Sequence, residues 1–141
     1  MSASPSAWRS SMNKKIGNDF EAELCRILSS RGYWCHNFQQ NAAGQPADII
    51  AAKNRVTYLI DAKVCERGEF RLSRMEENQR LAMRLWNQTG NGTGYFALKL
   101  PDGTIFLFAV DFLLELEKIG RTVLDEAEIR RLGVPLEAMI L

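Results

Sequence analysis

Residues 56–64 constrain the fold of this chain more than any other segment. Their sequence, VTYLIDAKV, is rich in β-branched and aromatic residues and is apolar immediately before Asp61, which is typical of a strand at the centre of a sheet. Two charges, Asp61 and Lys63, then interrupt the run. Because they are two residues apart on a strand, both side chains leave one face while Ala62 points to the other. Either an ion pair or a solvated site is needed to accommodate them.

The rest of the chain predicts alternating helices and strands around this segment. Strands are expected at residues 33–38, 46–51, 95–100 and 104–110, a loop at 39–45, and helices at 18–31, 73–88, 111–119 and 124–132. The run from Ser73 to Glu76 matches a capping box at the start of the second helix. The resulting order, α-β-β-β-α-β-β-α-α, favours an α/β fold with a mixed sheet flanked by helices.

The length and composition indicate one globular domain. The chain has 141 residues, of which 46% are apolar and 25% charged, enough for one core and too few for two. Residues 1–15 are polar and basic without periodicity, so we expect a flexible basic arm there and a single domain at 16–141. No apolar run approaches the roughly 18 residues of a membrane span, and no signal-peptide core is recognisable. We therefore expect a cytoplasmic protein without a membrane partner.

The three cysteines, Cys25, Cys35 and Cys65, form no C-x-x-C pair. Their odd number and their spacings suit neither a disulfide framework nor a zinc ribbon. We expect reduced thiols.

The net charge is only +1, but it is distributed unevenly. Residues 1–101 hold 14 Lys and Arg against 9 Asp and Glu, a balance of +5, whereas residues 102–141 hold 4 against 8, a balance of −4. A nucleic-acid-binding face is therefore expected within the first hundred residues, with a merely solvated surface as the alternative. The candidate phosphate contacts are Lys14, Lys15, Lys53, Arg67, Arg71 and Arg74.

Three further polar residues are candidates for a site shared with the central strand. Glu21 lies at the border of the apolar stripe of the first helix, and Gln79 falls inside the apolar arc of the second, where an amide needs a partner. Asp48 begins the preceding strand, and a turn at residues 53–55 would place it diagonal to Asp61. Carboxylates with a backbone carbonyl suit Mg²⁺ or Mn²⁺, and a nearby lysine can orient or deprotonate a water. Phosphodiester hydrolysis needs these parts.

These candidate site residues, taken in chain order, resemble the motif of a known nuclease superfamily. Glu21, Asp48, Asp61-Ala62-Lys63 and Gln79 are similar to the motif of the PD-(D/E)XK nucleases, and within them to the small Holliday junction resolvases of the archaeal Hjc and bacterial RecU types. The resemblance covers about residues 17–110. It implies a restriction-endonuclease-like αβββαβ core with a mixed central sheet flanked by helices.

The resemblance also implies a role for each matched residue. The metal ligands would be Asp48, Asp61, the backbone carbonyl of Ala62 and Glu21, with Mg²⁺ as cofactor and Mn²⁺ as a substitute. The catalytic residues would be Lys63, Glu21 and Gln79.

Three features depart from the pattern of these resolvases. Proline stands two residues before Asp48 rather than next to it, and the second acid is Asp61 where these resolvases usually carry glutamate. The segment between Glu21 and Asp48 is too short for the stalk of RecU-like enzymes. The Hjc-like form therefore fits better.

The expected function is a Mg²⁺-dependent, structure-selective DNA endonuclease that resolves four-way junctions by paired nicks. Its partner would be branched DNA, and we expect a homodimer, because symmetric cleavage needs two centres related by a two-fold axis. The strands at residues 95–110 or the apolar C-terminal tail would supply the interface. Two alternatives stay open: another PD-(D/E)XK nuclease acting on flap or duplex DNA, and a non-catalytic DNA-binding protein with a structural acidic cluster.

Overall fold

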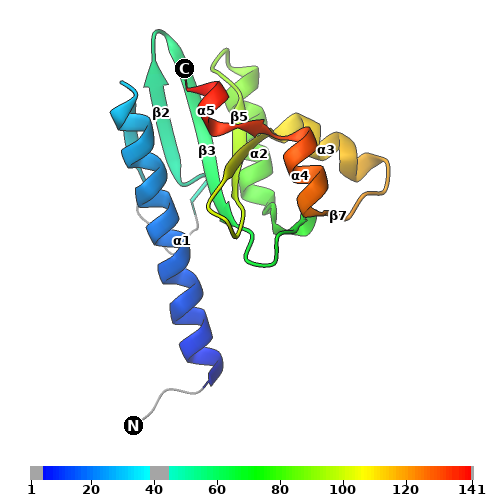
Figure 1. Cartoon of the computed structure of the whole chain (residues 1–141). Coiled ribbons are helices and arrows are strands. Elements are labelled where there is room, and N and C mark those ends of the chain that lie inside the picture. Colours follow the sequence, from blue (N-terminus) through cyan, green and yellow to red (C-terminus); the bar gives the residue numbers. More distant parts are fainter. Residues whose placement is uncertain (1–4, 39–44, 141) are drawn as a thin grey trace.

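The computed structural model describes residues 5–38 and 45–140 and arranges them around one six-stranded sheet (Figure 1). Residues 1–4, 39–44 and 141 lie outside this description. They include the start of the expected arm and most of the expected loop at 39–45.

The described elements follow the expected order with a few short additions. The central sheet has the order β1-β2-β3-β5-β6-β8, and its strands are β1 (Trp34–Asn37), β2 (Ile49–Lys53), β3 (Val56–Val64), β5 (Gly94–Lys99), β6 (Ile105–Ala109) and β8 (Val134–Pro135). A second, two-stranded sheet pairs β4 (Phe70–Arg71) with β7 (Val123–Leu124). The helices are α1 (Pro5–Ser30), the 3-10 turn η1 (Leu72–Arg74), α2 (Glu77–Gln88), α3 (Val110–Lys118), α4 (Glu126–Leu132) and α5 (Leu136–Met139).

The mixed sheet predicted from the sequence is confirmed, with β3 near its centre. β3 pairs antiparallel with β2 and parallel with β5. The parallel pairing requires a crossover, which η1 and α2 provide. Beyond Ile60, whose partner in β2 is Ile49, β3 continues to Val64 with β5 alongside. The β2 side of this last part of β3 is where the cavity described below opens.

The β2–β3 turn differs from the predicted turn by one residue. Asn54 and Arg55 both have positive φ, 51° and 67°, and Lys53 pairs directly with Val56. This is the backbone of a two-residue hairpin turn, in which both central residues are left-handed. The shorter turn shifts the strand register, so that Asp48 lies directly beside Asp61 instead of diagonal to it.

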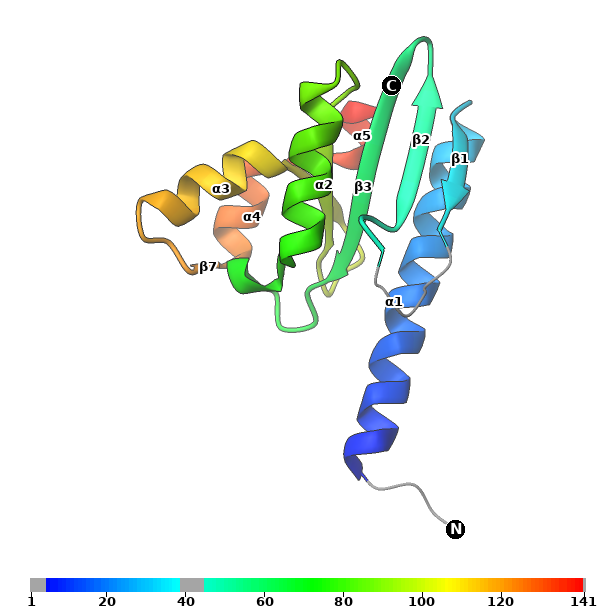
Figure 2. The same cartoon turned by 180° about the vertical axis from the view of Figure 1, so that it is seen from behind.

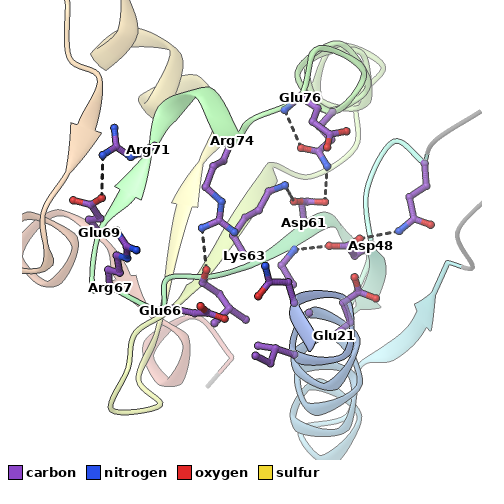
Figure 3. A pocket seen from close by; sticks show the side chains of 17 residues that line it. Glu21, Asp48, Asp61, Lys63, Glu66, Arg67, Glu69, Arg71, Arg74 and Glu76 are labelled. Atoms are coloured by element: carbon purple, nitrogen blue, oxygen red, sulfur yellow. Dashed lines mark hydrogen bonds and ion pairs between the residues drawn. The ribbon is translucent and has the colours of Figure 1, made fainter. Parts of the chain in front are cut away.

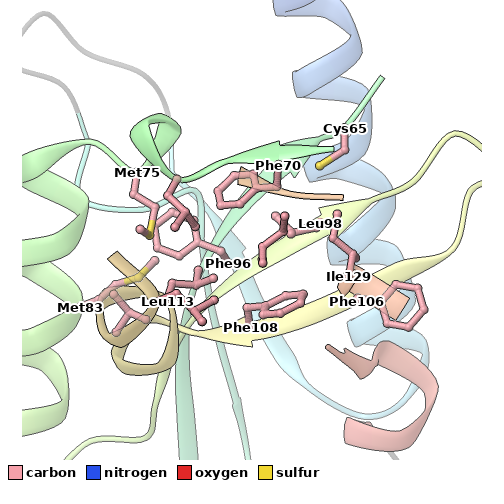
Figure 4. Packing of buried hydrophobic residues seen from close by; sticks show 14 of the residues in the cluster. Cys65, Phe70, Met75, Met83, Phe96, Leu98, Phe106, Phe108, Leu113 and Ile129 are labelled. Atoms are coloured by element: carbon pink, nitrogen blue, oxygen red, sulfur yellow. The ribbon is translucent and has the colours of Figure 1, made fainter. Parts of the chain in front are cut away.

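Each face of the sheet is covered by its own helices and its own core. α1 and α5 pack on one face, where Phe20, Leu24 and Leu28 meet Ile49 and Ile60. α2, α3 and α4 cover the other face, over the cluster of Phe70, Met83, Phe96, Phe108, Leu113 and Ile129 (Figures 2 and 4). The sheet therefore has α1 and α5 on one face and α2, α3 and α4 on the other.

α1 begins earlier than the sequence predicted. The expected start was residue 18, whereas the helix runs from Pro5, so the expected border between arm and domain at residues 15 and 16 falls inside one continuous helix. Residues 6–15 are exposed, and they extend past the edge of the sheet in both views (Figures 1 and 2). Because this part of the helix buries no face, it leaves no apolar periodicity to detect. Within residues 5–38 and 45–140, no helix has both the length and the hydropathy of a membrane span.

Candidate active site

A cavity of about 630 Å³ opens beside β3, at the point where β2 begins. The residues predicted to carry the chemistry all line it: Glu21, Asp48, Asp61, Ala62, Lys63 and Gln79 (Figure 3). They come from α1, from the residue before β2, from β3 and from α2. The four elements therefore converge on one site.

Asp48 and Asp61 lie side by side on one face of the sheet. Asp48 directly precedes Ile49, whose partner is Ile60, and the Asp48 amide donates to the Ile60 carbonyl at 3.1 Å. The side chain of Asp48 then accepts the Ala62 N–H at Oδ2, 2.8 Å away. This bond satisfies a backbone donor that β2 is too short to reach. Because N–H and C=O of one strand residue leave the same side, the Ala62 carbonyl also points toward this gap.

Asp61 is held by one cation and one amide. Its exposed fraction is 1%, Lys63 Nζ lies 3.1 Å from Oδ2, and Gln79 Nε2 donates to Oδ1 at 3.0 Å. The Lys63 contact is an ion pair by distance, and Oδ2 accepts no hydrogen bond of good geometry from the described residues. A buried carboxylate oxygen in this state has lone pairs left for a further cation.

Gln79 also caps the helix that carries it. Its Oε1 accepts the Glu76 N–H at 3.1 Å, so the capping box is formed by Glu76 and Gln79. The predicted box from Ser73 to Glu76 is wrong, because η1 occupies residues 72–74 and α2 starts only at Glu77. The inward amide marked by the helical pattern thus has two partners, and its orientation is fixed by both.

Crowding of carboxylates dominates the electrostatics of the site. Burial, followed by the charge of Asp48 and a hydrogen bond with it, raises the pKa of Glu21 to about 8, and Lys63 acts in the opposite direction. The pKa of Asp61 is raised well above its usual value, first by burial and next by Asp48, and is lowered in part by Lys63. Like charges this close cannot all ionise without compensation. A bound divalent cation would supply it.

Most of the chain matches one known family. Residues 12–141 match the family model described as archaeal Holliday junction resolvase (Hjc). The chain belongs to the Hjc family. Among solved structures it is similar to Hjc of Archaeoglobus fulgidus, a Holliday junction resolvase from an archaeal hyperthermophile, with a TM-score of 0.70 and 21% identity, covering 89% of this chain and 100% of that one. No curated protein sequence matches.

Membership of the Hjc family confirms the resemblance inferred from the sequence motif. It also confirms the choice of the Hjc-like over the RecU-like form. The likeness to the Archaeoglobus fulgidus structure supports the restriction-endonuclease-like fold, and the family is one of nucleases that act on Holliday junctions.

The residues of this Hjc-family site are suited to a divalent cation but are not arranged as a finished ligand set. Within residues 5–38 and 45–140, no three His, Cys, Asp or Glu side chains already converge in that way. Protein donors also occupy several of the acidic oxygens, with Asp48 accepting from Ala62 and from Gln45. The oxygen-only donor set, the raised pKa values and the Asp61 Oδ2 that accepts no hydrogen bond from the described residues fit a hard divalent cation.

Gln45 is a site residue that the sequence analysis missed. Its Nε2 donates to Asp48 Oδ1 at 2.8 Å, and its backbone carbonyl accepts from Asn78 Nδ2 of α2 at 2.9 Å. Its own Oε1 is buried without a partner among the described residues. A glutamine in a polar loop gives no signal of this kind, because its role depends on the distance between the β2 start and α2.

The predicted phosphate contacts fall into two groups. Arg67, Arg71 and Arg74 line the cavity, whereas Lys14, Lys15 and Lys53 do not. Lys53 lies at the far end of β2, where it donates to the Arg31 carbonyl at 2.6 Å and lies over the Tyr33 ring. Arg74 donates to the Val64 carbonyl at 2.9 Å. Three acids that were not singled out, Glu66, Glu69 and Glu76, also line the rim.

The raised pKa of Glu21 leads to a stability prediction. In the unfolded chain this carboxyl titrates near 4.5, and in the fold near 8. The folded state therefore holds the proton more tightly, and stability falls as pH rises from about 4.5 to 8. We expect Glu21→Gln to raise the free energy of unfolding at pH 8 by about 1–2 kcal/mol, a value reduced for the access of water to the cavity, and to change it little at pH 4.

Urea unfolding in EDTA at both pH values checks this prediction. Glu23→Gln serves as the matched control, since Glu23 lies on the same helix and pairs with Lys99 outside the cavity. Equal stability of wild type and Glu21→Gln at pH 8 would contradict the electrostatic description of the site.

Proposed function

We propose that this member of the Hjc family resolves four-way DNA junctions by paired nicks in a reaction that depends on Mg²⁺, with Mn²⁺ as a substitute. The observation that carries the proposal is the placement of Asp48 beside Asp61, with the Lys63 ammonium 3.1 Å from Asp61 Oδ2. Two acids and one amine at the edge of an open cavity are the parts required for metal-assisted phosphodiester hydrolysis. The family membership supports the same activity.

Four groups would hold the cation, namely Asp48, Asp61, the Ala62 carbonyl and Glu21. When bound, the ion would polarise the scissile phosphate and lower the pKa of a bound water. Lys63 would donate a hydrogen bond to the attacking water and offset negative charge that grows on the phosphate. Gln79 would keep the Asp61 carboxylate in one orientation through the 3.0 Å contact to Oδ1.

Basic residues on the rim of the cavity would bind the phosphate backbone of the DNA. Arg67 and Arg71 lie on the loop and strand that follow β3 and line the open side of the cavity (Figure 3). Contacts to phosphates fix the position of a duplex arm without reading its bases. The geometry of the branch, rather than a base sequence, would then select the substrate.

A cleavage assay on matched substrates tests the proposal. A labelled four-way junction, a flap and a linear duplex of the same arm sequences are incubated with the protein in Mg²⁺, in Mn²⁺ and in EDTA. We expect junction cleavage in both metals and none in EDTA, with flap and duplex cut at least about tenfold more slowly. Preferred cleavage of the flap or duplex would favour another PD-(D/E)XK activity, and junction binding without cleavage would favour a non-catalytic protein.

A homodimer is part of the proposal, with the interface on α2. In the two regions expected from the sequence, β5 and β6 lie inside the sheet and Leu136 and Ile140 are buried. α2 instead exposes Leu81 and Leu85, at 58% and 60%, one turn apart on the face opposite its buried Gln79. An isologous contact there would fix two active sites relative to each other.

Leu85→Glu is expected to weaken the dimer by about 10²-fold or more, because each dimer would contain the charge twice. Sedimentation velocity across a concentration series measures the change. A plasmid carrying a cruciform reports the consequence, since paired nicks linearise it and single nicks only relax it. The control is Ile119→Glu, at a side chain that is 74% exposed at the end of α3. A Leu85→Glu protein that stays dimeric would place the interface elsewhere.

A further inference from the structure

Two of the three cysteines face each other across α1 and β1. The Sγ atoms of Cys25, on α1, and Cys35, on β1, lie 2.8 Å apart. This is closer than two sulfur atoms normally come in non-bonded contact. Both side chains are half-buried, and both cysteines are free thiols in the structure. The sequence analysis expected reduced thiols without expecting any two of them to meet.

The local fold makes this contact a fixed one. α1 ends at Ser30, Gly32 takes a φ of 89°, and the Tyr33 amide donates back to the Leu28 carbonyl at 3.1 Å. This turn sends β1 back along the helix, and β1 is itself held in register by β2, with Cys35 opposite Ala51. Both half-buried cysteines pack against the core between α1 and the sheet. The third cysteine, Cys65, is buried in the core on the other face.

We infer that Cys25 and Cys35 form a disulfide site that links α1 covalently to the edge strand β1. With a low-molecular-weight disulfide as oxidant, the thiolate of one cysteine attacks it, forming a mixed disulfide and releasing one thiol. The second cysteine then attacks the mixed disulfide and releases the second thiol. Two protein thiols and one oxidant disulfide thus give one protein disulfide and two small thiols, and no rearrangement of backbone elements is needed.

The Cys25–Cys35 disulfide would lie on the side of the molecule that carries Glu21. Cys25 lies one turn after Glu21 on the same stripe of α1, and Cys35 lies on the strand next to β2, which starts after Asp48. A bond between them closes a short loop and restricts the unfolded chain. It would also keep α1 from separating from the β1–β2 edge at temperatures where the reduced protein begins to open. The site contacts themselves would not change, since the sulfurs already meet.

The test compares oxidised and reduced full-length protein. The chain is incubated for hours with oxidised glutathione, because burial and the hydrogen bond with Cys25 raise the pKa of the Cys35 thiol and slow exchange. We expect an intact mass lower by two hydrogen atoms, a peptide map joining Cys25 to Cys35, and a Tm higher by about 5–10 °C that dithiothreitol reverses. Binding of a four-way junction, measured on the oxidised protein, should stay within twofold.

Two variants keep the inference falsifiable. Cys25→Ser removes the link and should abolish the rise in Tm, whereas Cys65→Ala leaves both partners in place and should retain it. Retention of the rise in Cys25→Ser would overturn the inference. A stable mixed disulfide with glutathione, two unmodified thiols, or a bond that involves Cys65 would overturn it as well. None of these outcomes depends on whether the protein cleaves DNA.

Discussion

Asp61→Asn is expected to lower cleavage of a four-way junction by about 10³-fold or more and to leave junction binding within about threefold. Asparagine keeps the size of the side chain and can still accept from Gln79, whose Nε2 lies 3.0 Å from Oδ1. It removes the negative charge that a divalent cation requires. Because Asp61 is 1% exposed, the substitution leaves the surface that would contact DNA unchanged.

Single-turnover cleavage and a mobility shift in Ca²⁺ measure the two effects of Asp61→Asn separately. Titration calorimetry with Mn²⁺ adds a readout that does not depend on DNA, and we expect the variant to lose binding. Asp111→Asn, on the exposed side of α3, is the matched control and should behave as wild type. Cleavage by Asp61→Asn within tenfold of wild type would contradict the proposed metal site.

Lys63→Ala is expected to reduce both activity and stability. The ammonium is 14% exposed and lies 3.1 Å from the Asp61 carboxylate. Its loss removes the group that would hold the attacking water, which we expect to cost about 10²–10³-fold in cleavage. It also leaves a buried carboxylate without its cation. Removing one partner of such a pair destabilises a fold, and we expect up to about 3 kcal/mol at pH 8.

The pH dependence of the stability of Lys63→Ala distinguishes an unpaired buried charge from a simple packing defect. The pKa of the Asp61 carboxyl is raised, so this group takes up a proton as the pH falls, and the stability lost in Lys63→Ala should be smaller at pH 5 than at pH 8. The double variant Lys63→Ala with Asp61→Asn should recover most of the stability at pH 8 without recovering cleavage. Lys118→Ala, at an exposed pair on α3, is the control. A loss of equal size at both pH values would contradict an electrostatic cause.

Most of the sheet and most of the acidic site could be predicted from the sequence. The run at residues 56–64 has a pattern that only a central strand explains, and its two charges share a face because strand side chains alternate. Gln79 was identified because an amide in an apolar arc needs a partner. Its partner, Asp61, is 18 residues away in sequence, yet both positions follow from local periodicity alone.

The parts that could not be predicted depend on distances between elements. Gln45 reaches Asp48 and α2 only because the chain before β2 passes close to both. Lys53 has the charge of a phosphate contact, but the register carries it to the end of β2 away from the cavity. The first turns of α1 bury no face and so lack a pattern. The Cys25–Cys35 contact likewise arises from the antiparallel return of β1 along α1.

The two-residue turn at Asn54 and Arg55 has a consequence for how the protein tolerates change. It lies at the opposite end of the hairpin from the acids, in a surface loop where length variation is usually harmless. Here one additional residue that shifted the pairing of β2 with β3, rather than lengthening the loop, would exchange the two faces of β2. Asp48 would then project among the apolar residues beneath α1 while Asp61 stayed in place. Such an insertion would abolish cleavage by separating Asp48 from Asp61, although every residue of the motif would still be present in the sequence.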